Sequence, residues 1–206
     1  MNDSIRTGDA RVPPGQYVTE KWPVLTYGET PRIAPADWSF RISGLVAREV
    51  VLSWADFQAL PRVEVTADFH CVTRFSTLDN GWEGVSTREL LARAEVRSEA
   101  AFVLVHSYGG YTTNLPLEDL LSERALLADT QNGRPLPVEH GGPARLVVPH
   151  LYAWKSAKWV NGVELMAEDR RGFWEENGYH TYGDPWLEER FSSQETTQAY
   201  QVRRRA

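Results

Sequence analysis

Apolar and polar side chains alternate between residues 63 and 71. The odd positions are apolar and the even positions are polar, as in a strand with one buried face. Cys71, the single cysteine among the 206 residues, takes the last position of this strand and lies on its inward face. Residues 73–81 are polar and turn-like, so we expect the sulfur to lie at the floor of a loop.

The rest of the pattern predicts short strands and three short helices. An unbroken apolar run at residues 101–105 predicts a buried strand that ends before His106. Ser53 and Ser86 are suitable N-caps and predict helices at residues 54–60 and 90–94, the second behind a capping box that Glu89 completes. Further strands are expected at residues 38–42, 111–115, 125–129, 145–149 and 163–166, and a third helix at residues 117–121.

Prolines set the first 37 residues apart from the rest of the chain. Residues 1–37 contain Pro13, Pro14, Pro23, Pro31 and Pro35, so we expect an extended arm with little regular structure. The apolar cluster at residues 22–28 is the part of this arm most able to dock on the domain. Residues 38–206 are then expected to form a single domain, since a chain of 206 residues is long enough for one well-filled core.

Composition excludes several classes of function. A net charge of −6 disfavours binding to nucleic acids or anionic membranes, and the one basic cluster is a short tail of arginines at residues 203–205. The chain shows neither an apolar signal segment nor a run of about 18 apolar residues, so we expect a soluble, cytoplasmic protein. Eight tryptophans and eight tyrosines are typical of a large pocket or a loop-rich fold.

Three interpretations compete for Cys71. A lone free cysteine often behaves as a small buried apolar residue. The neighbouring His70 and Arg74 would favour a thiolate, however, and a thiolate can serve as a nucleophile or as a ligand for a soft metal. The sequence therefore leaves a structural cysteine, a catalytic thiol and a metal ligand open.

A second candidate site combines glycines with cations. Gly141 and Gly142 allow the backbone to approach a ligand closely, Arg145 can hold a phosphate with two donors, and Lys158 adds a point charge. This combination suits a phosphorylated cofactor. The same residues would also occur in a tight turn beside a solvated basic strand end.

Four motifs in a fixed order resemble the molybdopterin-binding domain of the sulfite oxidase family. They are DFHCVT at residues 68–73, WEGV at residues 82–85, HGGPARLVVP at residues 140–149 and KSAKW at residues 155–159. The resemblance covers about residues 20–190 and is strongest to the short, single-domain bacterial members. It implies a loop-rich α+β fold with mixed sheets.

The resemblance also implies a cofactor, molybdenum held by one molybdopterin. Cys71 matches the thiolate that ligates the metal, and the arm near residues 24–26 is expected to close over the pterin. The further cofactor contacts implied are His70, His106, His140, Arg145, Ser156, Ala157 and Lys158.

The implied reaction is transfer of an oxygen atom to or from a small oxyanion or sulfoxide. Family members that oxidise sulfite carry two adjacent arginines after the cysteine, whereas here only Arg74 is present and Phe75 follows, which weakens the case for sulfite. Arg74 and His180 are expected to line the anion entrance of the active site. Tyr179 and His180 are candidate hydrogen-bonding groups at the substrate funnel, although their aromatic surroundings equally indicate packing.

Neither a haem domain nor a dimerisation domain is apparent, so an external electron carrier is expected. Two alternatives stay open. One is a protein that binds the cofactor without turnover. The other is a hydrolase that uses Cys71 with a histidine, although His70 should point to the opposite face of the strand.

Overall fold

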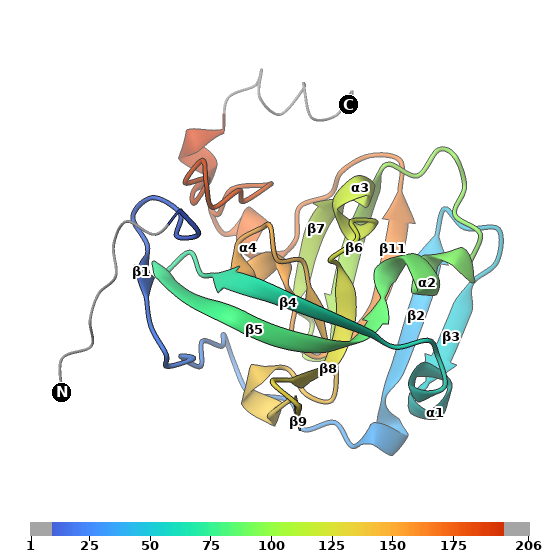
Figure 1. Cartoon of the computed structure of the whole chain (residues 1–206). Helices are drawn as coiled ribbons and strands as arrows, with labels where there is room; N and C mark the ends of the chain where they lie inside the picture. Colours follow the sequence, from blue (N-terminus) through green and yellow to red (C-terminus); the bar gives the residue numbers. More distant parts are fainter. Residues whose placement is uncertain (1–9, 196–206) are drawn as a thin grey trace.

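Two mixed β-sheets packed against each other form the frame of the computed structural model, which describes residues 10–195 (Figure 1). The first sheet runs β1-β5-β8-β10, with β4 added beside β5 and β9 beside β8. Its strands are β1 (Tyr17–Val18), β4 (Val63–His70), β5 (Phe75–Ser86), β8 (Leu126–Gln131), β9 (Arg134–Pro135) and β10 (Arg145–Val147).

The second sheet has the order β3-β2-β11-β6-β7. Its strands are β2 (Ser39–Gly44), β3 (Val50–Ser53), β6 (Phe102–Ser107), β7 (Thr112–Pro116) and β11 (Val160–Met166). The pairs β2–β11 and β1–β5 are parallel and the others are antiparallel.

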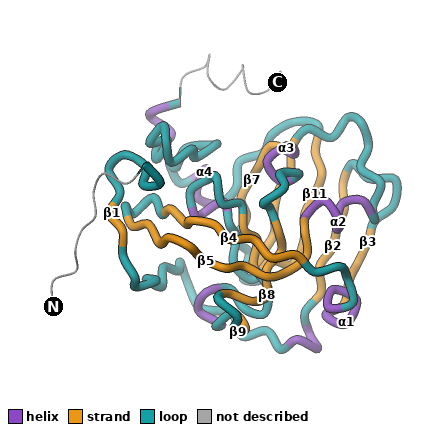
Figure 2. The backbone as a smooth tube through the Cα atoms, in the orientation of Figure 1, coloured by secondary structure: helices purple, strands orange, loops and turns teal. Residues whose placement is uncertain are grey.

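The helices are short, and loops make up much of the remaining chain (Figure 2). The α-helices are α1 (Trp54–Gln58), α2 (Thr87–Ala92), α3 (Leu117–Leu120) and α4 (Phe173–Glu176), and the 3-10 helices are Pro35–Asp37, Val138–His140, Ala153–Lys155 and Ser192–Gln194. The expected loop-rich α+β fold with mixed sheets is therefore confirmed.

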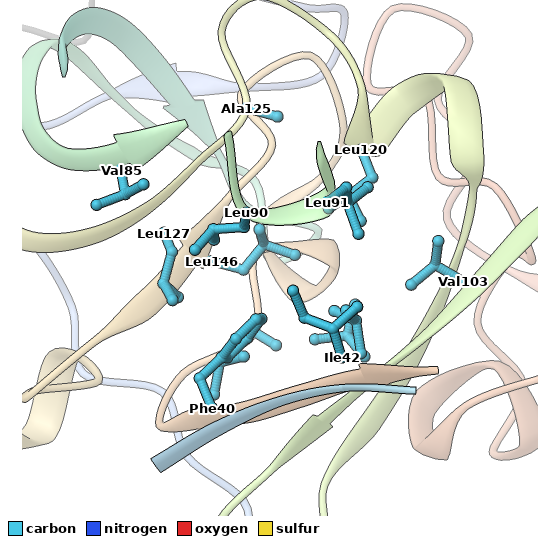
Figure 3. Packing of buried hydrophobic residues seen from close by; sticks show 14 of the residues in the cluster. Phe40, Ile42, Val85, Leu90, Leu91, Val103, Leu120, Ala125, Leu127 and Leu146 are labelled. Carbon is cyan, nitrogen blue, oxygen red and sulfur yellow. The ribbon is translucent and has the colours of Figure 1, made fainter. Parts of the chain in front are cut away.

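The main core lies where the two sheets and three helices meet. Leu127 and Leu146 from the first sheet pack with Phe40 and Ile42 from the second, and Leu90 of α2 closes the cluster (Figure 3). Burial of each such side chain contributes about 1.5–3 kcal/mol relative to leaving it in water. A smaller apolar cluster, which includes Phe69 and Trp82, belongs to the first sheet and continues into the N-terminal arm.

The local predictions are largely confirmed. Strand β4 coincides with the alternating segment, and Cys71 follows it directly. Ser53 caps α1, and Ser86 caps α2 by accepting a hydrogen bond from the backbone N–H of Glu89. The predicted capping box also requires the Glu89 carboxylate to accept a hydrogen bond from the backbone N–H of Ser86. That bond is not formed, because the Glu89 carboxylate pairs with Arg93 instead.

The prediction of a loop at residues 73–81 is wrong, because most of this stretch is the start of strand β5. Three of its polar side chains, Ser76, Thr77 and Asn80, are buried within the sheet. Ser76 shares a hydrogen bond with His70, and Asn80 donates to the carbonyl oxygens of Ala67 and Thr77. Paired polar side chains can lie inside a fold at little cost, so polarity alone did not indicate a loop here.

The arm up to residue 37 is mostly irregular and lies against the first sheet. Trp22 is its main anchor, packed edge-on against Phe69 and Trp82. Tyr27, by contrast, leaves 70% of its surface exposed, so the cluster at residues 22–28 docks only in part. The basic tail at residues 203–205 lies outside the described residues, and within residues 10–195 no helix has the length and apolarity that crossing a bilayer requires.

Candidate cofactor and active site

A cavity of about 430 Å³ lies between the arm, the turn that joins β4 to β5, and the loops on the C-terminal side of the chain. Its walls come from segments that are far apart in sequence. They lie within residues 22–27, 69–75, 109–111, 140–145, 153–159 and 173–179. A cavity of this size can take a cofactor-sized ligand.

Cys71 lies in the wall of this cavity, in the tight turn between β4 and β5. The backbone N–H of Arg74 donates to the Cys71 carbonyl (2.9 Å), and the Cys71 N–H donates to the carbonyl of Phe75 (2.9 Å). The thiol is 7% exposed, and the Thr73 hydroxyl donates to Sγ at 3.2 Å. Burial raises the pKa of the Cys71 thiol, so loss of its proton would need a strong electrophile such as a metal ion.

Arg145 is a buried cation whose hydrogen bonds within residues 10–195 all go to backbone carbonyls rather than to a carboxylate. It is 2% exposed and donates to the carbonyl oxygens of His140 (2.9 Å) and Ser156 (2.8 Å). Its guanidinium lies 5.0–5.6 Å from the ring centroids of Trp22, Phe69 and Trp82. Burial lowers the pKa of Arg145 to about 9. An unpaired buried charge is costly, and an anionic ligand such as a phosphate would relieve that cost.

The glycine turn before Arg145 packs tightly against the residues around it. Gly141 has a φ of 111°, which favours glycine, and a Cβ there would lie 3.0 Å from Cβ of Arg145 and 3.1 Å from Cα of Lys158. A Cβ at Gly142 would lie 2.3 Å from the carbonyl oxygen of Leu136. Gly141 therefore allows the turn to lie directly on Arg145 and Lys158, and Gly142 allows it to pack against the backbone of Leu136.

His140 precedes this turn and stacks on the indole of Trp22, with ring centroids 3.7 Å apart and planes 5° from parallel. Burial, and after it the charges of Lys158 and Arg145, lower the pKa of His140 to about 4. The imidazole is therefore neutral at neutral pH.

Lys158 joins the arm to the cavity wall. Its ammonium donates to the carbonyls of Leu25 (2.8 Å) and Glu139 (2.7 Å) and to the hydroxyl of Thr26 (3.0 Å). Burial lowers the pKa of Lys158 to about 8. Lys158 lines the cavity as expected, but its donors hold the arm in this structure rather than pointing to a free anion site.

Ser156 and Ala157 also line the cavity. The Ser156 hydroxyl accepts from the backbone N–H of Val148 (2.9 Å), and the carbonyl of Ala157 accepts from the N–H of Leu146 (2.8 Å). These bonds fix the segment against β10, the strand that carries Arg145.

Two predicted site residues beside Cys71 do not line the cavity. His70 points to the other face of β4, where its Nδ1 lies 2.9 Å from the Ser76 hydroxyl. Arg74 takes a left-handed conformation (φ 78°) at the turn and is exposed. His70 is therefore not placed for the expected cofactor contact, and Arg74 is not placed in the cavity wall for the expected role at the anion entrance.

His106 and His180 are also absent from the lining of the cavity. His106 faces Glu164 on the neighbouring strand, at 3.4 Å. His180 is buried, and its Nδ1 accepts from the backbone N–H groups of Tyr182 (3.1 Å) and Gly183 (3.2 Å). His180 therefore shapes its own loop, whereas the neighbouring Tyr179 does line the cavity.

Sequence reasoning missed the buried ion pair behind the cavity wall. Lys155 and Glu175 are both fully buried, with Nζ and Oε1 2.6 Å apart. Glu175 also accepts a hydrogen bond from the indole of Trp154 (2.9 Å), which lines the cavity. Breaking such a pair would leave an uncompensated buried charge, so it fixes α4 to the wall.

His140 makes the stability of the cofactor-free protein depend on pH. The unfolded chain takes up a proton on this imidazole near pH 6.5, whereas the folded chain does so only near pH 4. The contribution to stability is complete above about pH 6.5 and is lost as the pH falls towards 4. His140→Asn should therefore reduce the drop in unfolding free energy between pH 6.5 and 4.5 by about 2 kcal/mol.

Urea unfolding of the cofactor-free protein at both pH values measures this drop. His150→Asn is the matched control, since His150 is partly exposed beside Asp119. An equal pH dependence in wild type and His140→Asn would contradict the assignment.

The site combines the Cys71 thiol, the buried guanidinium of Arg145 and a large cavity that both residues line. A thiol can ligate a soft metal and a guanidinium can bind a phosphate, so these features define a protein that holds a phosphorylated, metal-containing cofactor. The residues fit molybdopterin, since Cys71 can ligate the metal and Arg145 can bind the phosphate. The chain belongs to the family described as "Oxidoreductase molybdopterin binding domain", whose model matches residues 27–174.

Individual relatives agree with this assignment. The oxidoreductase YuiH of Bacillus subtilis is 49% identical over 183 residues, which is 88% of this chain and 92% of that protein. The protein-methionine-sulfoxide reductase catalytic subunit MsrP of Campylobacter jejuni is 28% identical, over 71% of this chain and 55% of its own. The sulfane dehydrogenase SoxCD of Paracoccus pantotrophus has a similar structure, with a TM-score of 0.62 and 25% identity over 68% of this chain and 40% of that chain.

The sequence resemblance is therefore confirmed, and the protein is a molybdopterin-dependent oxidoreductase of the sulfite oxidase type. This assignment replaces the hydrolase alternative for Cys71.

Proposed function

We propose that this enzyme reduces an uncharged sulfoxide, with electrons from an external carrier, rather than oxidising sulfite. The net reaction takes two electrons and two protons, and it converts the sulfoxide to a thioether and water. The observation that carries the proposal is the aromatic character of the cavity wall around Cys71.

Few cations in the cavity lining are available to bind an anionic substrate. Arg145 and Lys158 are charged, but Arg145 is expected to bind the phosphate of the cofactor and Lys158 already holds the arm. Arg74, the one arginine that follows Cys71 closely, lies outside the lining. A sulfite dianion needs paired cations, so this wall is poorly suited to it.

The aromatic side chains suit a sulfur compound of low charge. Phe173 and Trp174 of α4 lie beside Tyr27 at the wall, with ring centroids 4.9 and 5.8 Å from that of Tyr27. Sulfur packs favourably against aromatic rings. The relative MsrP is named as a reductase of methionine sulfoxide in proteins, which supports the same substrate class.

Each site residue has a distinct role in this proposal. When bound, the molybdenum cofactor supplies a centre that exchanges two electrons and an oxygen atom. Cys71 would ligate the metal, and Arg145 would anchor the phosphate. Burial raises the pKa of Tyr179, so its hydroxyl stays protonated at neutral pH and can donate a hydrogen bond to the substrate oxygen.

The test is steady-state kinetics of the cofactor-loaded enzyme. Reduced methyl viologen serves as the electron donor, with dimethyl sulfoxide or methionine sulfoxide as substrates, and sulfite oxidation is measured with ferricyanide. We expect kcat/KM for a sulfoxide to exceed that for sulfite by about 100-fold, which corresponds to roughly 2.7 kcal/mol. Faster turnover of sulfite would overturn the proposal, and no turnover with either would favour a cofactor-binding protein.

Tyr179→Phe should lower kcat for the sulfoxide about 10- to 100-fold if its hydroxyl donates in the reaction. Tyr108→Phe is the control, since the Tyr108 hydroxyl bonds to the backbone near Ser39, away from the cavity lining.

A further inference from the structure

We propose that Arg190 is a positioning residue for Cys71, so that the C-terminal segment beyond the matched region completes the metal site. The inference rests on the role of Cys71 as the metal ligand. Arg190 lies 16 residues past the end of the region that the family model matches, residues 27–174. The blue arm and the red C-terminal segment meet at the end of the molecule where β4 joins β5 (Figure 1).

The Arg190 side chain reaches the turn that carries Cys71. Its Nη1 donates to the carbonyl oxygen of Val72, the residue directly after the cysteine, at 2.5 Å. Its Nη2 lies 3.5 Å from the carbonyl oxygen of Pro14 in the arm, and the guanidinium lies 5.0 Å from the ring centroid of Tyr152. Only 5% of Arg190 is exposed, so the charge is held in place rather than solvated.

A second side chain from outside the matched region holds the same turn. Gln16 donates through Nε2 to the carbonyl oxygen of Cys71 (3.1 Å), and its Oε1 accepts from the Ser76 hydroxyl (3.3 Å). The carbonyls of Cys71 and Val72 are thus fixed by residues from the two ends of the chain. Neither contact could be inferred from the motif that contains the cysteine.

The turn needs such support because its own geometry is unfavourable. Arg74 has a φ of 78°, in the left-handed region, which a residue with a side chain adopts at a cost in energy. Strained backbone persists only where the surroundings determine it. Arg190 and Gln16 supply that constraint on the side of the turn that precedes Arg74.

Arg190 also provides a fixed positive charge near the sulfur. The guanidinium is held against the carbonyl of Val72, the residue directly after Cys71. Glu188 lies 3.7 Å from Nη2, but its side chain is 45% exposed and solvent weakens its effect. The Nε of Arg190 is buried and makes no hydrogen bond with any described residue.

The experiment compares Arg190→Gln and Arg190→Lys with wild type. Arg171→Gln is the matched control, because Arg171 also ties the C-terminal segment, through Glu195, without contacting the Cys71 turn. Three quantities are measured: pterin content, the sulfur-to-molybdenum absorption of the loaded protein, and amide hydrogen exchange at residues 72–75 in the cofactor-free protein.

Arg190→Gln should keep pterin content within about twofold, since the phosphate anchor at Arg145 is intact. It should shift the absorption band and speed exchange at residues 72–75 about tenfold or more. Arg190→Lys should restore part of the band position but not the slow exchange, because it keeps the charge and loses the forked contact. Arg171→Gln should change none of the three.

An unchanged band and unchanged exchange in Arg190→Gln would overturn the proposal, as would equal changes in Arg171→Gln. Should Arg190→Gln fail to fold, Arg190→Lys decides, since unaltered exchange in that variant also contradicts positioning. Absence of molybdenum from the wild type would instead refute the cofactor assignment on which the proposal rests.

Discussion

Cys71→Ser is expected to abolish turnover while most of the pterin stays bound. The cofactor would have two separate anchors, its phosphate at Arg145 and its metal at the Cys71 sulfur, and this substitution removes only the second. A serine oxygen is a harder ligand than a thiolate and changes the redox balance of the metal. Turnover should fall by at least about 100-fold, with pterin content within about twofold of wild type.

Paired pterin quantification and visible spectra check this expectation. Thr73→Val is the control, since it removes the hydrogen bond to Sγ and keeps the sulfur. That variant should retain the sulfur-to-metal absorption, which Cys71→Ser should lose. Normal activity with an unchanged spectrum in Cys71→Ser would mean that Cys71 is only a small buried apolar residue.

Arg145→Met should give the opposite result, a large loss of cofactor with little loss of stability. A charge-assisted hydrogen bond is worth about 1.5–3 kcal/mol, so losing a two-pronged contact to phosphate should weaken binding about 100-fold or more. In the cofactor-free protein, Arg145 is a buried cation with no carboxylate partner among residues 10–195. Removing that charge offsets the two lost hydrogen bonds, so the unfolding free energy should change by less than about 1 kcal/mol.

Molybdenum and pterin content after purification measures the loss of cofactor. Urea unfolding of the cofactor-free protein measures the change in unfolding free energy. Arg48→Met is the matched control, because the Arg48 side chain is 66% exposed. Full occupancy in Arg145→Met would reject the phosphate role. A loss of several kcal/mol in the cofactor-free protein would show that the guanidinium serves the fold instead.

Local chemistry made part of this structure predictable. Strand β4 follows from alternation, the starts of α1 and α2 follow from Ser53 and Ser86, and His140, Arg145 and Lys158 came from motifs that the family shares. These predictions depend on residues close together in sequence or on motifs shared with a family, so a single sequence was enough to make them.

Long-range contacts account for what was missed. The polar half of β5 looks like a loop until its partners on β4 are known. His106 was assigned by its distance from Cys71 along the chain, although it shares a strand face with Phe102 and Leu104, opposite the fully buried Val103 and Val105. Arg190 lies 118 residues from Val72, so no local pattern could connect them. The cytoplasmic location and the need for an external electron carrier stay predictions.

The parallel pairing of β2 with β11 determines when this protein can fold. The Trp38 indole donates to the carbonyl of Val160, 122 residues further along the chain, and β2 lies between β3 and β11 in its sheet. During synthesis β2 therefore has only β3 beside it until residues 160–166 have left the ribosome, and the core around Phe40 and Ile42 stays incomplete until Val163 and Leu165 are added. Pairing of strands so far apart in sequence is slow, on the order of milliseconds to seconds, and until it occurs the exposed apolar surface can associate with other chains. Premature termination before β11 is thus expected to yield aggregates rather than a smaller folded domain.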